Sequence, residues 1–132
     1  NNTNKPIKKV KHTILLVDDE PALVEIGVAR LENMGYTVIS TTDPREALDK
    51  FKHNPSLFDG VITDQAMPYI TGIDLAKKML AIRPDIAIFL CTGFSQTVTL
   101  KKAKKVGIRE MLMKPLSMRD LSTVLQKNLN GG

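Results

Sequence analysis

The chain has 132 residues, of which 42% are hydrophobic, and both values are typical of one globular domain with its own core. Its single cysteine, Cys91, excludes an internal disulfide and fits a reducing compartment. No apolar run reaches the roughly 18 residues that span a bilayer, and the polar, basic N-terminus is unlike a secretory signal. We therefore expect a cytoplasmic protein that makes no membrane contact.

The net charge of +5 is unevenly distributed along the chain. Residues 1–12 contain four lysines and no acidic residue, so we interpret them as a basic linker or tail that precedes a domain at 13–130. A nucleic-acid or membrane patch would also use aromatic or arginine side chains, which this segment lacks, and we expect no nucleic-acid contact within the chain. A second lysine group is typical of the solvent face of a helix, with a docking surface for an acidic partner as the alternative: Lys101, Lys102, Lys104 and Lys105.

Short apolar runs alternate with amphipathic stretches five times, beginning with an apolar run at 14–17 that predicts a buried strand. Pro21 predicts the first turn of a helix that Gly35 ends. The apolar residues of this helix follow helical spacing: Leu23, Ile26, Leu31 and Met34. Next we expect a strand at 37–40 and a helix that runs from the capping-box pattern at 43–46 to about residue 51.

The second half of the chain continues the alternation. We expect a strand at 60–63, a loop at 67–72 and a helix that turns Leu75, Met79 and Ile82 inward. The remaining expected elements are a strand at 86–91, a helix at 96–106, a strand at 110–113 and a helix at 118–129. This alternation predicts an α/β fold of the flavodoxin-like (βα)5 type, a doubly wound parallel sheet of strand order 2-1-3-4-5. Ligands of such sheets bind beyond the carboxyl ends of the strands, here near the first and third.

Polar reactive side chains follow four of the expected strands. Asp18 and Asp19 follow the first strand, Asp64 the third, Thr92 the fourth and Lys114 the fifth. Three nearby carboxylates repel one another unless cations offset them, and both Lys114 and a hard divalent ion such as Mg²⁺ (or Mn²⁺) would do so. An aspartate can attack phosphorus to form an aspartyl phosphate, a transfer that needs alignment and cationic groups around the phosphoryl oxygens. The strand ends therefore predict a phosphoryl-acceptor site.

Four stretches of the sequence, at 14–20, at 61–68 with Gly72, at 91–93 and at 113–115, together fill the signature positions of a known family. In these stretches the chain resembles the receiver domains of response regulators in two-component signalling, and the resemblance covers residues 13–129. It implies that Asp64 accepts a phosphoryl group from a histidine kinase and that the domain then changes conformation. It also implies that the domain assists its own phosphorylation and dephosphorylation and is not an enzyme in the ordinary sense.

The same resemblance implies roles for the residues around Asp64. Thr92 and Lys114 would bind the phosphoryl oxygens. Asp19 would be the more direct of the two neighbouring metal ligands, and Asp18 would act partly through water. The implied ligands of the metal ion, Mg²⁺ or Mn²⁺, are the side chains of Asp18, Asp19 and Asp64 and the backbone carbonyl of Ala66.

Within that family, the chain is most similar to receivers at the C-terminal end of hybrid sensor histidine kinases, in the stretches 92–95, 107–110, 113–116 and 119–121. The implied partners are a histidine kinase, its own or a cognate one, and a histidine phosphotransfer protein. The family usually has Tyr or Phe three residues before the lysine as a rotating switch, whereas this chain has the flexible Met111. We also expect Phe94, two residues after Thr92, to shield an acyl phosphate from water.

Two other classes of protein share features with this sequence. An aspartate-nucleophile phosphatase would have an Asp-x-Asp pattern on its first strand, whereas here Asp18 and Asp19 are adjacent and the lone Asp64 follows the third. A nucleotide- or flavin-binding module would have a glycine-rich phosphate loop where this chain has the acidic residues 18–20. Taken singly, Asp18 and Asp19 also suit the start of a helix, and Cys91 suits an inert core thiol. The joint arrangement favours the phosphoryl acceptor.

Overall fold

The computed structural model of the chain describes residues 12–93 and 98–130. Most of the basic segment at 1–12, the expected water shield Phe94 and the first residues of the helix expected at 96–106 lie outside these ranges. His12, the last residue of that segment, contacts the domain, because its carbonyl accepts a 2.9 Å hydrogen bond from the Thr37 amide. Within the described ranges, none of the helices has the length and apolarity that a bilayer crossing requires.

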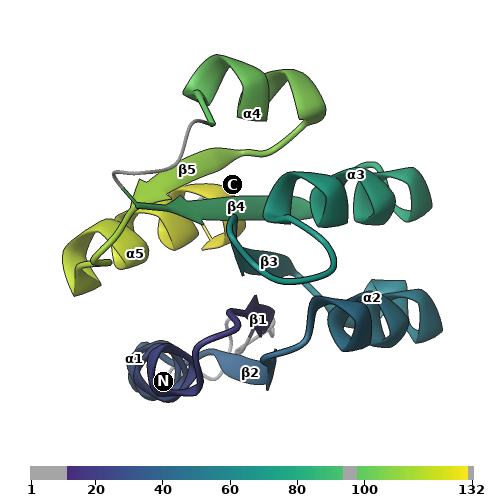
Figure 1. Ribbon diagram of the computed structural model, residues 1–132. Coiled ribbons are helices and arrows are strands. Elements are labelled where there is room, and N and C mark those ends of the chain that lie inside the picture. Colours follow the sequence, from purple (N-terminus) through teal and green to yellow (C-terminus); the bar gives the residue numbers. More distant parts are fainter. Residues whose placement is uncertain (1–11, 94–97, 131–132) are drawn as a thin grey trace.

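In the part of the chain that is described, five parallel strands form one sheet (Figure 1). They are β1 (Thr13–Val17), β2 (Thr37–Thr41), β3 (Gly60–Asp64), β4 (Ala87–Thr92) and β5 (Glu110–Met113). Their order, β2-β1-β3-β4-β5, confirms the predicted flavodoxin-like arrangement. The register pairs Val17 of β1 with Thr41 on one side and with Thr63 on the other, so the carboxyl ends of β1 and β3 lie side by side.

Helices cover both faces of the sheet (Figure 1). On one face lie α1 (Pro21–Asn33) and α5 (Met118–Leu125), and on the other lie α2 (Pro44–His53), α3 (Gly72–Ile82) and α4 (Leu100–Val106). A short 3-10 helix at Pro55–Leu57 and a π-helical turn at Gln126–Asn130 complete the described elements. The chain thus winds over one face and then the other, as predicted for a doubly wound sheet.

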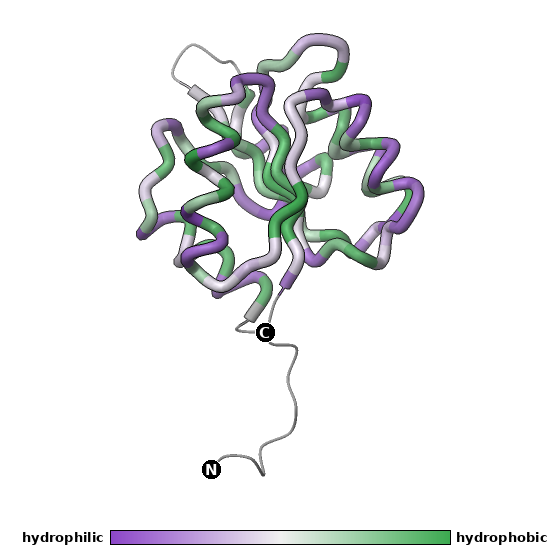
Figure 2. The backbone as a smooth tube through the Cα atoms, turned by 90° about the horizontal axis from the view of Figure 1, so that it is seen from below, coloured by the Kyte–Doolittle hydropathy of each residue, from purple (hydrophilic) through white to green (hydrophobic). Residues whose placement is uncertain are grey.

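Two apolar clusters, one on each face of the sheet, form the core. Leu15 of β1 packs in the cluster with Phe51 of α2, whereas its neighbour Ile14 belongs to the opposite cluster with Leu31 of α1. Successive strand residues point to opposite faces, and because both faces are covered, the inner strands are apolar throughout. Figure 2 shows these hydrophobic strands at the centre and hydrophilic residues recurring along the surrounding helices.

Three apolar residues of the predicted helical stripes are exposed. Ile82, expected to point inward, is the last residue of α3 and is 38% exposed. Leu23 and Ile26 of α1 are 37% and 46% exposed, and α1 buries Val24 and Leu31 instead. Leu23 and Ile26 border a cavity of about 420 Å³ beside the sheet. The rest of the domain therefore covers only part of the apolar stripe of α1.

The ends of α4 and α5 differ from the prediction. α4 begins at Leu100, later than the expected residue 96, because the Thr99 hydroxyl caps it by accepting a 3.1 Å hydrogen bond from the Lys102 amide. α5 ends at Leu125, and the remaining residues to Asn130 continue as the π-helical turn instead of the α-helix expected to reach 129. Neither change moves a strand end.

The capping box predicted at the start of α2 is only half formed. The Asp43 carboxylate accepts a 2.8 Å hydrogen bond from the Arg45 amide, as an N-cap should. The Glu46 carboxylate, however, accepts a hydrogen bond from the Thr41 hydroxyl instead of reaching the Asp43 amide. That amide donates to Thr41 Oγ1 at 3.1 Å, so Thr41 at the end of β2 stands between the two partners of the box.

Gly72, the first residue of α3, lies against the end of β3. A Cβ atom at this position would be 2.4 Å from the Asp64 carbonyl oxygen and 2.5 Å from Leu90 Cδ1. The Gly72 amide also donates a 2.9 Å hydrogen bond to the Gln65 carbonyl. Because backbone atoms limit the space, only glycine lets α3 start this close to Asp64.

We expect Gly72→Ala to lower the free energy of unfolding by about 1–3 kcal/mol, because the added methyl group overlaps backbone that cannot move independently. Gly27→Ala is the matched control. Its methyl group would be 2.7 Å from the end of the Leu16 side chain, which borders the cavity and can move into it. Alanine also favours the helix, so we expect this control to change stability little. Urea unfolding measures both, and equal losses would contradict the explanation.

Candidate functional site

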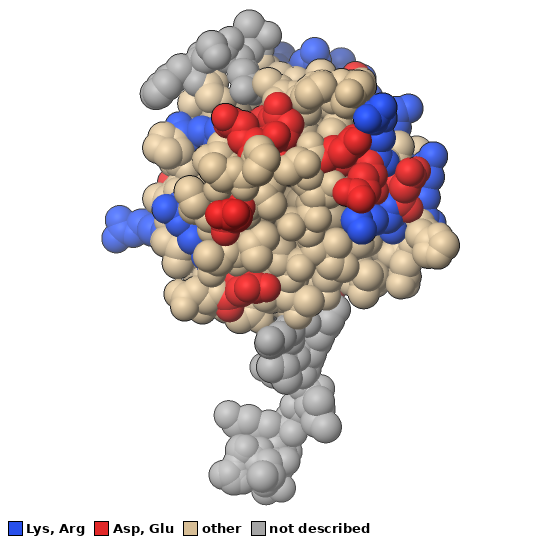
Figure 3. Space-filling view, turned by 60° about the horizontal axis from the view of Figure 1, so that its bottom comes forward, with Lys and Arg blue, Asp and Glu red and all other residues tan. Residues whose placement is uncertain are grey.

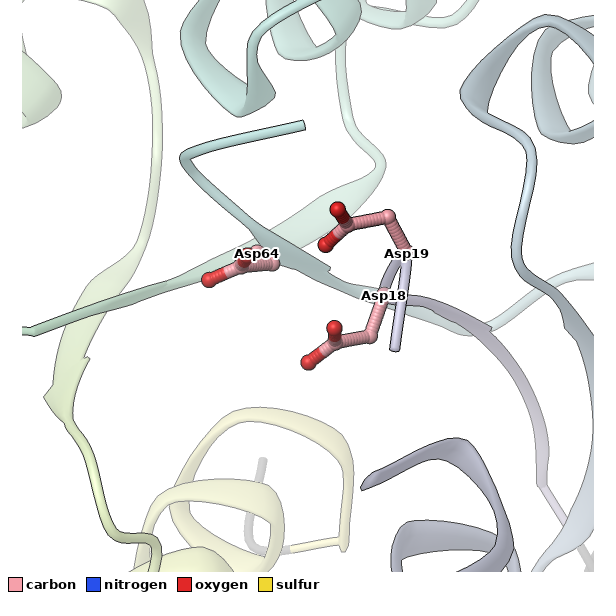
Figure 4. Close-up of side chains that lie close together, drawn as sticks. All are labelled: Asp18, Asp19 and Asp64. Atoms are coloured by element: carbon pink, nitrogen blue, oxygen red, sulfur yellow. The ribbon is translucent and has the colours of Figure 1, made fainter. Parts of the chain in front are cut away.

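Three carboxylates lie together where β1 and β3 end (Figure 4). Asp18 and Asp19 follow directly after β1, and Asp64 is the last residue of β3. Each contributes one carboxylate oxygen, and these three oxygens lie within 4.8 Å of one another. Asp18 and Asp64 are only 8% and 4% exposed, whereas Asp19 is half-buried. The structure therefore brings the three predicted metal-binding side chains to one place.

Helix capping does not account for Asp18 and Asp19. The residue that precedes α1 is Glu20, and it makes no side-chain capping hydrogen bond. Asp18 Oδ1 accepts a 3.0 Å hydrogen bond from the Glu20 amide, which fixes the turn between β1 and α1. Its second oxygen, Oδ2, faces the site, where Lys114 Nζ donates to it at 3.3 Å. Asp18 thus has one oxygen for the backbone and one for the site.

Lys114 is the cation of this group. It follows β5, where its amide donates a 2.8 Å hydrogen bond to the Thr92 carbonyl, and its peptide bond to Pro115 is cis. Its ammonium lies 2.9 Å from Asp64 Oδ1 and 3.3 Å from Asp18 Oδ2. The contact to Asp64 is a close ion pair between the ammonium and a buried carboxylate oxygen. One ammonium does not occupy all the lone pairs of a carboxylate, so Asp64 can still contact another electrophile or cation.

The charges of these four groups do not balance. Three carboxylates and one ammonium sum to −2 when all are ionised, although the net charge of +5, less four lysines at 1–12, leaves +1 for residues 13–132. On the face seen in Figure 3, acidic side chains lie in separate groups on a largely uncharged surface, with lysine and arginine toward its edges. The negative charge of the site is therefore local. A divalent cation fits this donor set, because hard cations prefer carboxylate oxygens.

The pKa values of Asp64 and Lys114 reflect this imbalance. Burial raises the pKa of Asp64 above its ordinary value, and the Asp18 carboxylate adds to the increase, while the Lys114 ammonium opposes it. Burial alone would lower the pKa of Lys114, but the Asp64 and Asp18 carboxylates together outweigh it and raise that pKa. The lysine is therefore firmly cationic, and the ionised form of Asp64 needs more positive charge than the lysine supplies.

Thr92 ends β4 at the same edge of the sheet and is 2% exposed. Its hydroxyl donates to the sulfur of Met113 at 3.5 Å, and none of the hydrogen bonds described for it goes to a carboxylate of the site. Cys91, the preceding residue, is buried, and burial raises the pKa of its thiol to about 12. This value fits the inert core thiol expected from the sequence.

The loop between β3 and α3 carries Ala66, whose backbone carbonyl the resemblance assigns to the metal site. Ala66 is exposed two residues after Asp64, and the structure describes no contact of its carbonyl. Two contacts hold the loop: Gln65 Oε1 accepts a 2.9 Å hydrogen bond from the Ile73 amide, and the Arg45 guanidinium of α2 lies 3.6 Å from the ring centroid of Tyr69 in the middle of the loop. Tyr69 has a positive φ of 73°, and this cation–π contact stabilises its exposed ring.

Two features beside the site have no clear signal in the sequence. Met113 binds the Thr92 hydroxyl, but a methionine at the end of an apolar strand gives no indication of this contact. Arg30 of α1 donates a 2.6 Å hydrogen bond to the Leu116 carbonyl, and the two residues are 86 positions apart. Both Arg30 and Leu116 border the cavity of about 420 Å³ that Asp64, Asp18 and Lys114 also line.

Comparisons with known proteins agree with the fold. Residues 14–126 match the family described as the response regulator receiver domain. The chain is 34% identical over 116 residues to the transcriptional regulatory protein ZraR of Escherichia coli strain K12, covering 88% of this chain but 26% of that protein. It is 31% identical over 116 residues to the response regulator receiver protein CpdR of Brucella abortus, covering 88% of this chain and 95% of CpdR. The chain thus spans about a quarter of ZraR and nearly all of CpdR.

A solved structure extends the comparison to three dimensions. A response regulator receiver domain protein from Clostridium thermocellum superimposes with a TM-score of 0.87 at 32% identity, over 91% of this chain and 95% of that one. The family match covers most of the sequence, and the strand order is the one predicted from it. The chain therefore belongs to the response regulator receiver domain family.

Proposed function

We propose that this domain accepts a phosphoryl group on Asp64 and switches conformation in response, as a step of a two-component phosphorelay. The observation that carries the proposal is the buried Asp64 carboxylate, whose Oδ1 lies 2.9 Å from the Lys114 ammonium beside two more carboxylates. Such a carboxylate combines a nucleophilic oxygen with a neighbouring cation that can stabilise the transferred group. The new bond would join an Asp64 carboxylate oxygen to phosphorus, while the bond from phosphorus to the donor nitrogen or oxygen breaks.

The residues around Asp64 would each stabilise the transferred group. The Lys114 ammonium would pair with a phosphoryl oxygen, and the buried Thr92 hydroxyl would donate to another after leaving Met113. Asp18, Asp19, Asp64 and the Ala66 carbonyl would hold Mg²⁺ or Mn²⁺, whose charge would offset the phosphoryl oxygens. An aspartate-nucleophile phosphatase is the alternative function, and sustained turnover of a phosphate ester would distinguish it from the proposed acceptor.

We further propose a histidine kinase as phosphoryl donor, a histidine phosphotransfer protein as a further partner, and the cytoplasm as the location. The sequence stretches at 92–95, 107–110, 113–116 and 119–121 support an origin at the C-terminal end of a hybrid sensor kinase, with residues 1–12 as linker and 13–130 as receiver. The readout surface would be formed by α4, β5 and α5, because β5 leads to Lys114 and pairs with β4 at Thr92.

Incubation with Mg²⁺ and acetyl phosphate should add the mass of one phosphoryl group to each chain, as measured by intact-protein mass spectrometry. Asp64→Asn should abolish this addition, because the nucleophilic oxygen is lost. Lys114→Ala should slow it by about a hundredfold, because it removes the cation beside that oxygen. Asp49→Asn, an exposed change on α2, is the matched control and should label normally. Labelling of Asp64→Asn, or sustained turnover of a phosphate ester, would contradict the proposal.

Addition of Mg²⁺ should raise the free energy of unfolding by about 2.7 kcal/mol at a hundred times its dissociation constant, since only the folded chain gathers the three carboxylates. Asp19→Asn should lose most of this response, and without metal it should be more stable than the wild type because it relieves repulsion. Asp74→Asn changes an exposed carboxylate in the first turn of α3 and should keep the full response. Urea titrations with and without Mg²⁺ measure these differences. An equal Mg²⁺ response in both variants would place the ion elsewhere.

A further inference from the structure

A hydrogen bond joins α1 to the loop that follows Lys114. Arg30 Nη1 donates to the Leu116 carbonyl at 2.6 Å, across 86 residues of sequence. A guanidinium bound to a carbonyl forms a charge-assisted hydrogen bond, which is stronger than one between neutral groups. Arg30 is half-buried, so water competes less for its donors than at an open surface. This bond therefore holds a backbone position two residues beyond Lys114.

On that side the Leu116 side chain packs against the core cluster that contains Leu31 and Leu121, and the bond from Arg30 holds the Leu116 backbone. On the strand side, the Lys114 amide donates to the Thr92 carbonyl at 2.8 Å, which fixes the beginning of the segment. Beyond it Pro115 is exposed, and Arg30, Pro115 and Leu116 all border the cavity of about 420 Å³ between α1 and the loop. Figure 1 shows α1 and α5 on the same side of the sheet, with the loop from β5 leading into α5. Arg30 reaches the loop across this space.

We infer that Arg30 is a positioning residue for Lys114: its bond to the Leu116 carbonyl fixes the loop so that the ammonium lies against Asp64. This inference rests on the proposed phosphoryl transfer for its consequence and on the contacts of Arg30 and Lys114 for its geometry. The ammonium is 2.9 Å from Asp64 Oδ1 and 3.3 Å from Asp18 Oδ2, so a small shift of the loop would break both contacts. Arg30 acts through Lys114 and does not itself touch the acceptor.

A double-mutant cycle tests the inference with the full chain, Mg²⁺ and acetyl phosphate. Arg30→Met keeps a long side chain but removes the donors, and it should slow labelling by about tenfold, because a misplaced catalytic group loses most of its effect. In a Lys114→Ala background the same change should have no further effect, since residues that act through one another are not additive. Arg30→Lys keeps a donor and should restore part of the rate. Arg119→Met, an exposed arginine of α5, is the matched control and should label normally.

Three results would overturn the inference. They are normal labelling of Arg30→Met, an equal slowing by Arg30→Met with and without Lys114, and a loss of Mg²⁺ affinity in Arg30→Met as large as its loss of labelling rate. The last two would mean that Arg30 supports the domain as a whole. Urea unfolding confirms that each variant is folded before its rate is compared.

A second measurement does not depend on phosphoryl transfer. Trace labelling with acetic anhydride reports how free each lysine amine is, and the ion-paired Lys114 should react slowly compared with the exposed Lys50. Arg30→Met should raise the reactivity of Lys114 relative to Lys50, whereas Arg119→Met should leave it unchanged. If the wild type takes no phosphoryl group, the proposed function fails, and this ratio still decides the role of Arg30. An unchanged ratio in Arg30→Met would overturn it.

Discussion

Mutual repulsion among three carboxylates at one edge of the sheet is the constraint on which the rest of the site depends. Asp18, Asp19 and Asp64 lie within 4.8 Å of one another because β1 and β3 are neighbours in a parallel sheet and end side by side. Among the described residues, Lys114 supplies the one ammonium that is ion-paired to this group. The deficit of positive charge therefore follows from the topology, and a divalent cation is the natural group to correct it.

Asp64 is packed more tightly into the fold than Lys114. Asp64 ends a strand inside the sheet, and the start of α3 at Gly72 closes against its carbonyl so tightly that a methyl group does not fit. Lys114 leads into a loop beside a cavity, where Pro115 is exposed and a bond from Arg30 crosses the space. A fixed nucleophile beside a cation on a long, flexible side chain suits a site that must admit a phosphoryl group between them, because the ammonium can follow the incoming charge while the bond from Arg30 holds the loop.

The sequence predicts the strands and the residues that follow them, but it misses features that depend on tertiary packing. Buried apolar runs and the residues after them place the strands and the carboxylates of the site, because period and polarity are local properties. Leu23 and Ile26 also follow the helical period, yet they are exposed beside a cavity that exists only in the folded chain. The bond from Arg30 to Leu116 joins residues 86 positions apart through a backbone carbonyl, which any residue offers, so no side-chain pattern marks it.

Two methionines, Met111 and Met113, lie on the strand beside Thr92, and Met111 occupies the position where this family usually has an aromatic ring. The Thr92 hydroxyl donates to Met113, and a thioether is a weak acceptor, so exchanging it for a phosphoryl oxygen costs little. Met111, at the usual aromatic position, is partly buried against the core cluster that contains Ala103 of α4. An unbranched thioether can fill a changing space through several rotamers. Under the proposed function, movement of Thr92 would therefore be transmitted to α4 by repacking of methionine side chains, with no rotation of a ring between two fixed positions.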